Sequence, residues 1–168
     1  MEKYKIIVAG PGGAGKTTLV WSLGEGEFYD RTTMTVRGQS HLLKLFDEEG
    51  KGVELQIFDL AGQEQFFEEE RLKNLASDGD AAIVCFDLSD LGSLDDVEKW
   101  VSVLPPGIPK ILVGTKIDLI SEEEVKMTLD DAKEYVEHFK FRGIYSASAK
   151  DQESLEKILE IVVDILTK

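Results

Sequence analysis

Short apolar runs of strand length alternate along the chain with stretches in which apolar residues recur every three or four positions. The runs predict β-strands at residues 4–9, 39–47, 53–59, 81–87, 110–114 and 141–146, and the periodic stretches predict helices at 16–23, 68–76, 93–103, 129–139 and 154–166. Strands that alternate with helices are typical of α/β proteins with a largely parallel sheet. We therefore expect one α/β domain over residues 1–168, with a six-stranded, mostly parallel sheet flanked by about five helices.

The connections between these elements refine the expected sheet. The polar, glycine-rich segment 47–52 joins the second and third runs and predicts a hairpin, hence one antiparallel edge strand. The runs 81–87 and 110–114 are apolar without interruption, as is typical of central strands covered on both faces. Residues 24–38, and 60–80 outside the helix at 68–76, are predicted as long connections, and connections of this length usually carry function.

The charge of the chain is strongly acidic, with 19 basic and 33 acidic side chains and a net charge of −14. Such a surface repels DNA, RNA and anionic lipid, so we expect no nucleic-acid partner. The single cysteine, Cys85, lies inside an apolar run, which predicts a buried thiol in a reducing, cytoplasmic setting. The given chain shows no signal peptide, no run of membrane-spanning length and no lipidation motif, so no direct lipid anchor is expected in it.

The strongest chemical signal is the segment Gly10-Pro11-Gly12-Gly13-Ala14-Gly15-Lys16-Thr17, a complete G-x-x-x-x-G-K-[ST] phosphate loop between a predicted strand and a predicted helix. Its glycines let the backbone curve around an anion, so that successive N–H groups point at phosphate oxygens beside the positive end of the helix. We expect Lys16 to neutralise the β and γ phosphates and the Thr17 hydroxyl to coordinate Mg²⁺. The loop predicts that the chain binds a nucleoside triphosphate.

A second motif, Asp59-Leu60-Ala61-Gly62-Gln63-Glu64, begins where the strand 53–59 ends. A carboxylate at this place beside a phosphate loop is expected to hold Mg²⁺, directly or through water. Gly62 allows the backbone to approach a terminal phosphate, and the Gln63 amide has the donors and acceptors needed to orient a nucleophilic water.

Two further motifs follow the strands 110–114 and 141–146. In Thr115-Lys116-Ile117-Asp118, the Asp118 carboxylate can accept hydrogen bonds from guanine N1–H and its 2-amino group, a donor pair that adenine lacks, and the Lys116 stem can cover a face of the base. In Ser148-Ala149-Lys150, the backbone N–H groups are candidates to reach a base carbonyl. Each tetrapeptide or tripeptide alone is an ordinary loop sequence, and their order along the chain gives them meaning.

These four motifs in this order resemble those of the Ras-like small GTPases, and the resemblance covers essentially the whole chain. It implies the P-loop NTPase G-domain fold, with Thr18 beside the phosphates, Phe28 packed on the guanine edge and Thr35 as the first-switch threonine that binds Mg²⁺. The family usually has proline before that threonine. Here it is Met34, which leaves Thr32 and Thr33 as rivals for the role. Thr115 replaces the usual asparagine of the guanine motif, as in the Rho-like branch.

The resemblance implies a molecular switch that binds GTP or GDP with Mg²⁺, hydrolyses GTP through Lys16 and Gln63, and controls protein effectors. It also implies an exchange factor and a GTPase-activating protein as partners. Arg31 is expected to be a surface side chain, the alternative being an arginine that acts on the γ-phosphate in cis. A nucleotide-loaded binding module with negligible hydrolysis is the second interpretation, against which Gln63 argues. A phosphate-loop kinase or ATPase is disfavoured by Asp118 and by the lack of a lid insertion.

Overall fold

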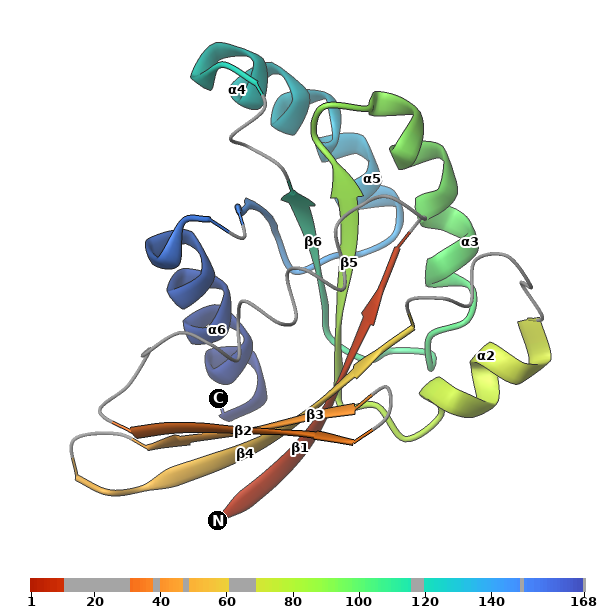
Figure 1. The fold of residues 1–168 in the computed structure, drawn as a ribbon. Coiled ribbons are helices and arrows are strands. Elements are labelled where there is room, and N and C mark those ends of the chain that lie inside the picture. The colour runs from red at the N-terminus through yellow and green to blue at the C-terminus, as the bar shows by residue number, and fades with distance from the viewer. Residues whose placement is uncertain are drawn as a thin grey trace.

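A single β-sheet runs through the protein, and helices cover both of its faces (Figure 1). The computed structural model describes residues 1–10, 31–37, 40–46, 49–60, 69–115, 120–148 and 150–167. Helix α6 (Gln152–Thr167) packs on one face, while α2 (Glu69–Ala76) and α3 (Val97–Val101) pack on the other. The expected α/β class is confirmed.

The sheet has seven strands in the spatial order β2-β3-β4-β1-β5-β6-β7. Their bounds are β1 Glu2–Ala9, β2 Arg31–Arg37, β3 Ser40–Phe46, β4 Gly52–Asp59, β5 Ala81–Asp87, β6 Lys110–Thr115 and β7 Ile144–Ser146. Neighbours pair in parallel except β2–β3 and β3–β4, so β3 runs against the other six described strands. All six strands expected from the sequence are present, and a mostly parallel sheet with one antiparallel strand is confirmed.

The seventh strand, β2, lies in a segment that the sequence analysis assigned to the connection 24–38. It pairs with β3 along its whole length, from Arg31 opposite Phe46 to Arg37 opposite Ser40, and so it takes the edge position expected for β3. The prediction of a connection was wrong here because the segment lacks an apolar run. Its three threonines and one valine are nevertheless β-branched, which favours a strand.

The remaining helical segments are the 3₁₀ helix η2 (Leu91–Asp96), α4 (Glu122–Asp131) and α5 (Lys133–His138). The predicted helix 93–103 is therefore a 3₁₀ turn followed by a short α-helix. The predicted helix 129–139 begins earlier, at Glu122, and is interrupted at Ala132. The predicted helix 16–23 lies outside the described residues.

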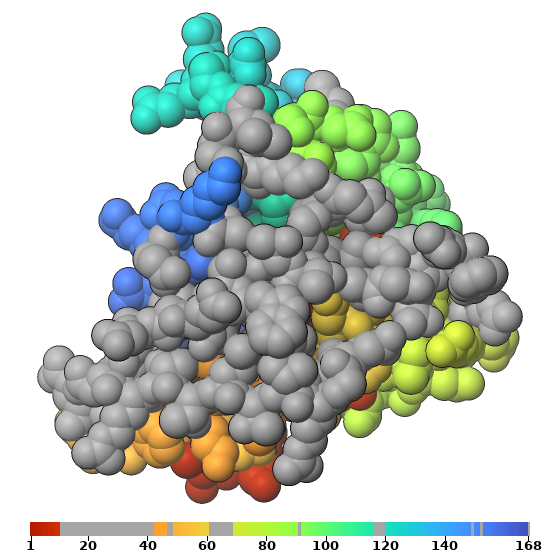
Figure 2. Space-filling model, in the orientation of Figure 1, coloured from red at the N-terminus to blue at the C-terminus, as the bar shows by residue number. Residues whose placement is uncertain are grey.

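Helix α4 begins earlier than expected because Ser121 caps it. The Ser121 hydroxyl accepts a hydrogen bond from the Glu124 N–H at 3.2 Å, and Glu122, Glu123 and Glu124 form the first turn, where the helix dipole favours negative charge. These three side chains are exposed, and α4 projects from the upper end of the molecule in Figure 2. The acidic run is thus the solvated N-terminal end of a helix.

Two apolar layers hold the sheet between its helices. Alternate residues of β1 face opposite sides: Ile6 and Val8 pack toward α6, whereas Ile7 and Ala9 pack toward α2 and α3. Trp100 is 1% exposed and belongs to the second layer. Cys85 is also buried, as expected. In the described part of the chain, no helix combines the length and the apolar character needed to cross a membrane.

Candidate functional site

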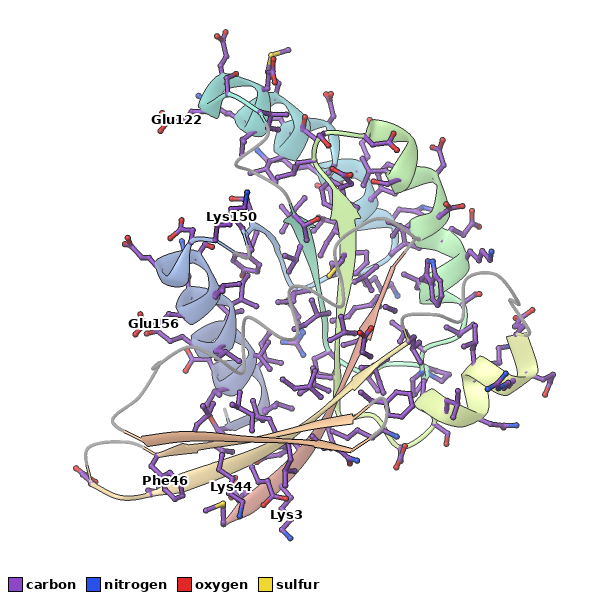
Figure 3. All side chains as sticks on the ribbon, in the orientation of Figure 1. Lys3, Lys44, Phe46, Glu122, Lys150 and Glu156 are labelled. Carbon is purple, nitrogen blue, oxygen red and sulfur yellow. The ribbon has the colours of Figure 1, made fainter. Side chains whose placement is uncertain are left out.

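Four predicted motifs meet at one edge of the sheet, where the parallel strands end. β1 leads into Gly10, β4 ends at Asp59, β6 ends at Thr115, and β7 leads into Ser148. Figure 3 shows Lys150 at the same edge, just before α6 begins. Open α/β sheets bind their ligands in the crevice outside the carboxyl ends of the strands. The topology therefore brings the beginnings of all four motifs together.

Gly10 opens the phosphate-loop motif in a conformation that only glycine adopts readily. Its φ is +145°, and a Cβ atom placed on it would lie 2.3 Å from the backbone oxygen of Cys85 in β5. The strand end therefore touches its neighbour at the start of the predicted loop. The loop residues expected to hold phosphate (Gly12, Gly13, Ala14, Gly15, Lys16, Thr17 and Thr18) lie outside the described residues.

Asp59 places a carboxylate beside the start of that loop. It is 5% exposed and lies opposite Val8 of β1, two residues before Gly10, and the next N–H, that of Leu60, donates to the Val8 carbonyl oxygen at 3.0 Å. A carboxylate is the hard oxygen donor that Mg²⁺ prefers, so Asp59 fits the predicted metal. Across the described ranges no group of three or more His, Cys, Asp or Glu side chains forms a metal site by itself.

Thr35, the other predicted metal ligand in the described chain, is not beside Asp59 in this conformation. It lies in β2 opposite Leu42, which in turn pairs with Gln56, three residues before Asp59 on β4. Two strand spacings and three residues put the Cα atoms of Thr35 and Asp59 about 14 Å apart. That separation is too large for one Mg²⁺, whose ligand oxygens lie about 2.1 Å from the ion.

The backbone also places the alternatives to Thr35. Thr32 and Thr33 lie on the same strand, opposite Leu45 and Lys44 of β3. Arg31 opens β2. Phe28, Gly62 and Gln63 lie outside the described residues.

Thr115 holds the end of β6 against β5. It is 4% exposed, its hydroxyl donates to the Phe86 carbonyl oxygen at 3.1 Å, and its own carbonyl accepts the Leu88 N–H at 3.1 Å. The first residue of the predicted guanine motif thus fixes the point from which Lys116 and Asp118 follow, and these two residues lie outside the described chain.

The loop that carries Ser148 and Lys150 is tied to the first turn of α6. The Ser148 N–H donates to the Ser154 hydroxyl at 3.1 Å, and the Lys150 N–H donates to the Ser148 hydroxyl at 3.1 Å. The Ser154 hydroxyl donates in turn to the Asp151 carbonyl oxygen at 2.8 Å. The Asp151 carboxylate caps the helix by accepting the Glu153 N–H at 3.1 Å.

These bonds reduce the number of backbone N–H groups in residues 148–150 that can reach the carbonyl of a bound base. Three N–H groups were candidates to reach a base carbonyl, and those of Ser148 and Lys150 are already donated within the protein. The N–H of Ala149, which lies outside the described residues, is the remaining candidate. Nothing in the local sequence marks Ser154 as the partner, because the bond joins residues six positions apart.

A buried carboxylate that the sequence analysis did not single out, Asp87, ends β5 between β1 and β6. Its Oδ1 accepts the N–H of Ser89 at 2.8 Å and the Ser89 hydroxyl at 2.6 Å. Its backbone N–H donates to the Ser93 hydroxyl at 2.9 Å. Asp87 therefore shapes the turn after β5. Ser93 bonds within this turn, and Asp90 caps η2 by accepting the Gly92 N–H at 3.0 Å.

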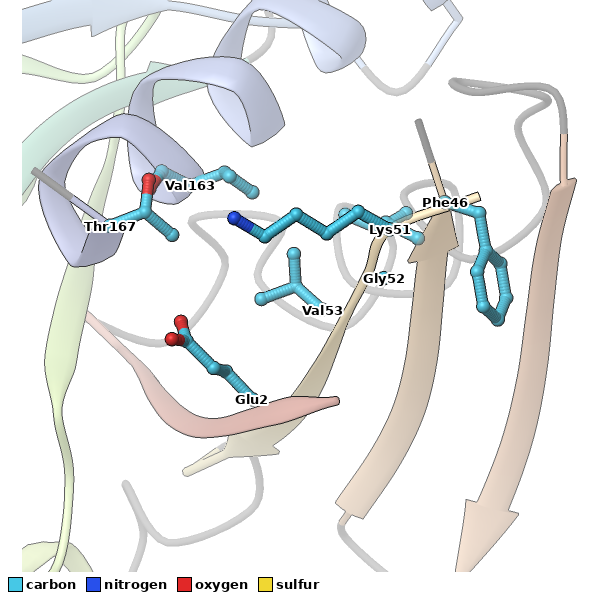
Figure 4. Close-up of a pocket in the computed structure, with 8 residues that line it drawn as sticks. Glu2, Phe46, Lys51, Gly52, Val53, Val163 and Thr167 are labelled. Atoms are coloured by element: carbon cyan, nitrogen blue, oxygen red, sulfur yellow. The ribbon is translucent and has the colours of Figure 1, made fainter. Parts of the chain in front are cut away.

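A separate pocket of about 230 Å³ lies at the opposite end of β1, away from the candidate site (Figure 4). Its walls are formed by Glu2, Leu45, Phe46, Lys51, Gly52, Val53, Val163 and Thr167. The Lys51 side chain extends toward Val163 and Thr167, at the C-terminal end of α6. Helix α6 has no basic residue in its own last turn, so Lys51 supplies a positive charge where the helix dipole favours one.

Comparison with known proteins identifies the relatives of the chain. The Ras family model matches residues 5–168. Ras-related protein Rab-21 from Homo sapiens is 34% identical over 159 residues, which cover 92% of this chain and 68% of that protein. Rho-related GTP-binding protein RhoB from Homo sapiens is 32% identical over 173 residues (94% and 86%), and Ras-related protein Rab-33A from Mus musculus is 28% identical over 163 residues (94% and 67%).

Proposed function

Because the chain belongs to the Ras family of small GTPases, we propose that residues 1–168 form one G domain that binds GTP, hydrolyses it to GDP and phosphate, and switches between two conformations. The observation that carries this proposal is the convergence of Gly10, Asp59, Thr115 and Ser148 at the carboxyl edge of one sheet. Each of these residues is the first of a motif whose remaining residues suit one part of a guanine nucleotide.

The proposed reaction is in-line attack of water on the γ-phosphoryl group. The phosphate-loop N–H groups and Lys16 hold the phosphates, and Gln63 orients the water. Asp59 and Thr17 hold Mg²⁺, joined by Thr35 in the triphosphate state. When bound, Mg²⁺ stabilises the charge on the β and γ oxygens. Without a partner protein, such a site turns over at roughly 10⁻⁴ to 10⁻² per second.

Base selection is assigned to the loops after β6 and β7. Asp118 accepts the guanine N1–H and 2-amino hydrogens, Lys116 covers the base, and the Ala149 N–H donates to the base carbonyl. The hydrogen bonds of Thr115 to β5 and of Ser148 to α6 support this assignment, because they fix the ends of both loops.

Switching follows from the position of Thr35 in β2. For Thr35 to reach the metal held by Asp59, the end of β2 has to separate from β3. We expect residues 30–38 and 60–78 to differ between the diphosphate and triphosphate forms, and protein effectors, an exchange factor and a GTPase-activating protein to read that difference.

Phosphate release from protein loaded with GTP, measured in a single turnover, tests the proposed function. The Gln63→Leu variant keeps the bulk of the side chain but loses the amide, so hydrolysis should fall about tenfold or more while GDP affinity stays within about twofold. Gln56→Leu, the same change at an exposed position of β4, is the matched control and should hydrolyse at the parent rate. No measurable hydrolysis by the parent would favour the nucleotide-loaded binding module.

Competition binding tests the base. ATP should fail to displace labelled GDP at concentrations at which GTP displaces it completely. Asp118→Asn should weaken GTP binding and improve binding of xanthosine triphosphate, whose 2-carbonyl needs a donor. Equal displacement by ATP and GTP would contradict the assignment of Asp118.

A further inference from the structure

Lys5, in the middle of β1, contacts the end of helix α2 although 70 residues of chain separate them. Its ammonium donates to the Leu75 carbonyl oxygen at 3.0 Å and forms an ion pair with Asp78. It also lies 4.9 Å from the centre of the Phe58 ring on β4. The side chain is only 14% exposed, whereas that of Asp78 is 73% exposed, so Lys5 reaches outward from the covered face of the sheet.

The backbone of Lys5 adds two bonds to the same segment. Its N–H donates to the Asp80 carboxylate at 2.7 Å, and its carbonyl oxygen accepts the Asp80 N–H at 2.8 Å. The residues from Leu75 to Asp80 are thereby held at position 5 through both backbone and side chain. A substitution at position 5 can remove the contacts of the side chain, whereas the two backbone bonds remain.

The ammonium occupies the place where a helix needs a donor. The last four carbonyl groups of a helix have no partner within it, and Leu75 belongs to the last turn of α2. A positive charge there also complements the helix dipole. Within α2, Leu72 and Ala76 are buried and Leu75 is partly buried against the same apolar layer, so three apolar side chains and Lys5 hold the helix on the sheet.

Helix α2 begins directly after residues 61–68, which carry Gly62 and Gln63. At the other end of that segment, the Leu60 N–H is bonded to the Val8 carbonyl oxygen. The segment is therefore attached to β1 before its first residue and, through α2 and Lys5, again after its last.

We propose that Lys5 is a positioning residue, whose ammonium fixes the C-terminal end of α2 and thereby the orientation in which Gln63 is presented to the γ-phosphate. This inference rests on the proposed function. It adds a residue on the first strand, outside all four nucleotide motifs, to those that set the rate of hydrolysis.

The test compares Lys5→Met, which keeps the apolar stem over Phe58 and loses the charge, with Lys5→Arg, which keeps the charge. Lys3→Met is the matched control. Lys3 lies on the same strand, its side chain is 74% exposed, and its ammonium lies 4.0 Å from a carboxylate oxygen of Glu54 (Figure 3). Asp78→Asn changes only the exposed partner, and so gives a folded variant even if Lys5→Met is unstable.

Two rates are measured: hydrogen exchange of the amides at residues 72–78 in the GDP-bound protein, and single-turnover GTP hydrolysis. Lys5→Met should speed the exchange about tenfold or more, because a hydrogen bond to a charged group is lost. It should slow hydrolysis about fivefold while GDP dissociation stays within about twofold of the parent. Lys5→Arg should restore most of both rates, Asp78→Asn should speed exchange by a smaller factor, and Lys3→Met should match the parent.

Each other outcome removes part of the inference. Parent-like exchange in both Lys5→Met and Asp78→Asn would show that the ammonium does not anchor α2. Faster exchange with parent-like hydrolysis would show that the anchor does not position Gln63. A parent protein that releases no phosphate would overturn the proposed hydrolysis, and the exchange rates would still decide whether Lys5 anchors the helix.

Discussion

Substituting Gly10 by alanine tests the geometry at the start of the phosphate loop. The new Cβ would lie 2.3 Å from the Cys85 carbonyl oxygen, whereas such contacts are not found below 3.0 Å. β1 and β5 would have to separate, yet β5 is a buried central strand paired on its other side with β6. Backbone strain at φ +145° and overpacking against a fixed carbonyl together should cost about 4 kcal/mol of unfolding free energy.

Thermal unfolding with matched glycine variants measures this cost. Gly50→Ala and Gly107→Ala also place alanine at positive φ (+82° and +78°), but no atom lies within 4 Å of the added Cβ. They should therefore lose only about 1 kcal/mol. For a chain of this size, Gly10→Ala should melt about 12 °C below the parent and the controls about 3 °C below it.

All melts are made at one fixed GDP concentration, because a ligand that binds the folded state adds to the apparent stability. Repeating them at a tenfold higher concentration separates weaker GDP binding from a weaker fold. A Gly10→Ala variant as stable as Gly50→Ala and Gly107→Ala would refute the argument from the close contact with Cys85.

Three further substitutions test other parts of the structure. Ser154→Ala removes the acceptor of the Ser148 N–H, and it should lower stability by about 1 kcal/mol and speed GDP dissociation, measured by urea unfolding and nucleotide release. Burial lowers the pKa of Lys110, so Lys110→Met should raise the free energy of unfolding by up to about 0.5 kcal/mol. Urea unfolding should show this as a slightly higher midpoint, and a lower midpoint would contradict it. The hydrogen bond from Lys5 lowers the pKa of Asp78 in the folded protein. The Asp78 carboxylate therefore contributes its full stabilisation above its unfolded pKa of about 3.9, and this stabilisation is lost as the pH falls through the lower folded pKa. The difference in unfolding free energy between the parent and Asp78→Asn should be constant near neutral pH and vanish in acid.

The sheet was predictable from the sequence to the extent that its strands are buried. The run 81–87 is covered on both faces and reads as a continuous apolar string, and its predicted bounds match β5. Strand β2 could not be found in this way, because an edge strand needs no apolar run, and its pairing with β3 depends on contacts between separate segments. The start of α4 was missed because its first turn is charged and carries no apolar periodicity, although Ser121 and Glu124 have the S-x-x-E spacing typical of a capping box.

The sequence predicted where the residues of the candidate site lie in the fold, but not the hydrogen bonds that hold them there. Parallel strands end at one edge, so finding the motifs after β1, β4, β6 and β7 was enough to place them together. The sequence could not show that Ser154 takes the Ser148 N–H or that Thr115 donates to β5, since both bonds depend on three-dimensional proximity. The contact of Lys5 with Leu75 is of the same kind, and no motif indicates it.

The pairing of β2 with β3 also determines how much free energy the proposed movement of Thr35 toward the metal would require. Bringing Thr35 to the metal would release the end of β2, where Thr35, Val36 and Arg37 face Leu42, His41 and Ser40. Three residue pairs of an antiparallel ladder carry about three hydrogen bonds, each with a net contribution of about 1 kcal/mol, so the release costs roughly 3 kcal/mol. In the proposed switch, contacts of Thr35 with Mg²⁺ and the γ-phosphate would offset a cost of this size, whereas GDP, which lacks that phosphate, would leave the strand paired. An edge strand whose end can be released at this cost suits a two-state element, because its two positions differ by an energy that one phosphate group can reverse.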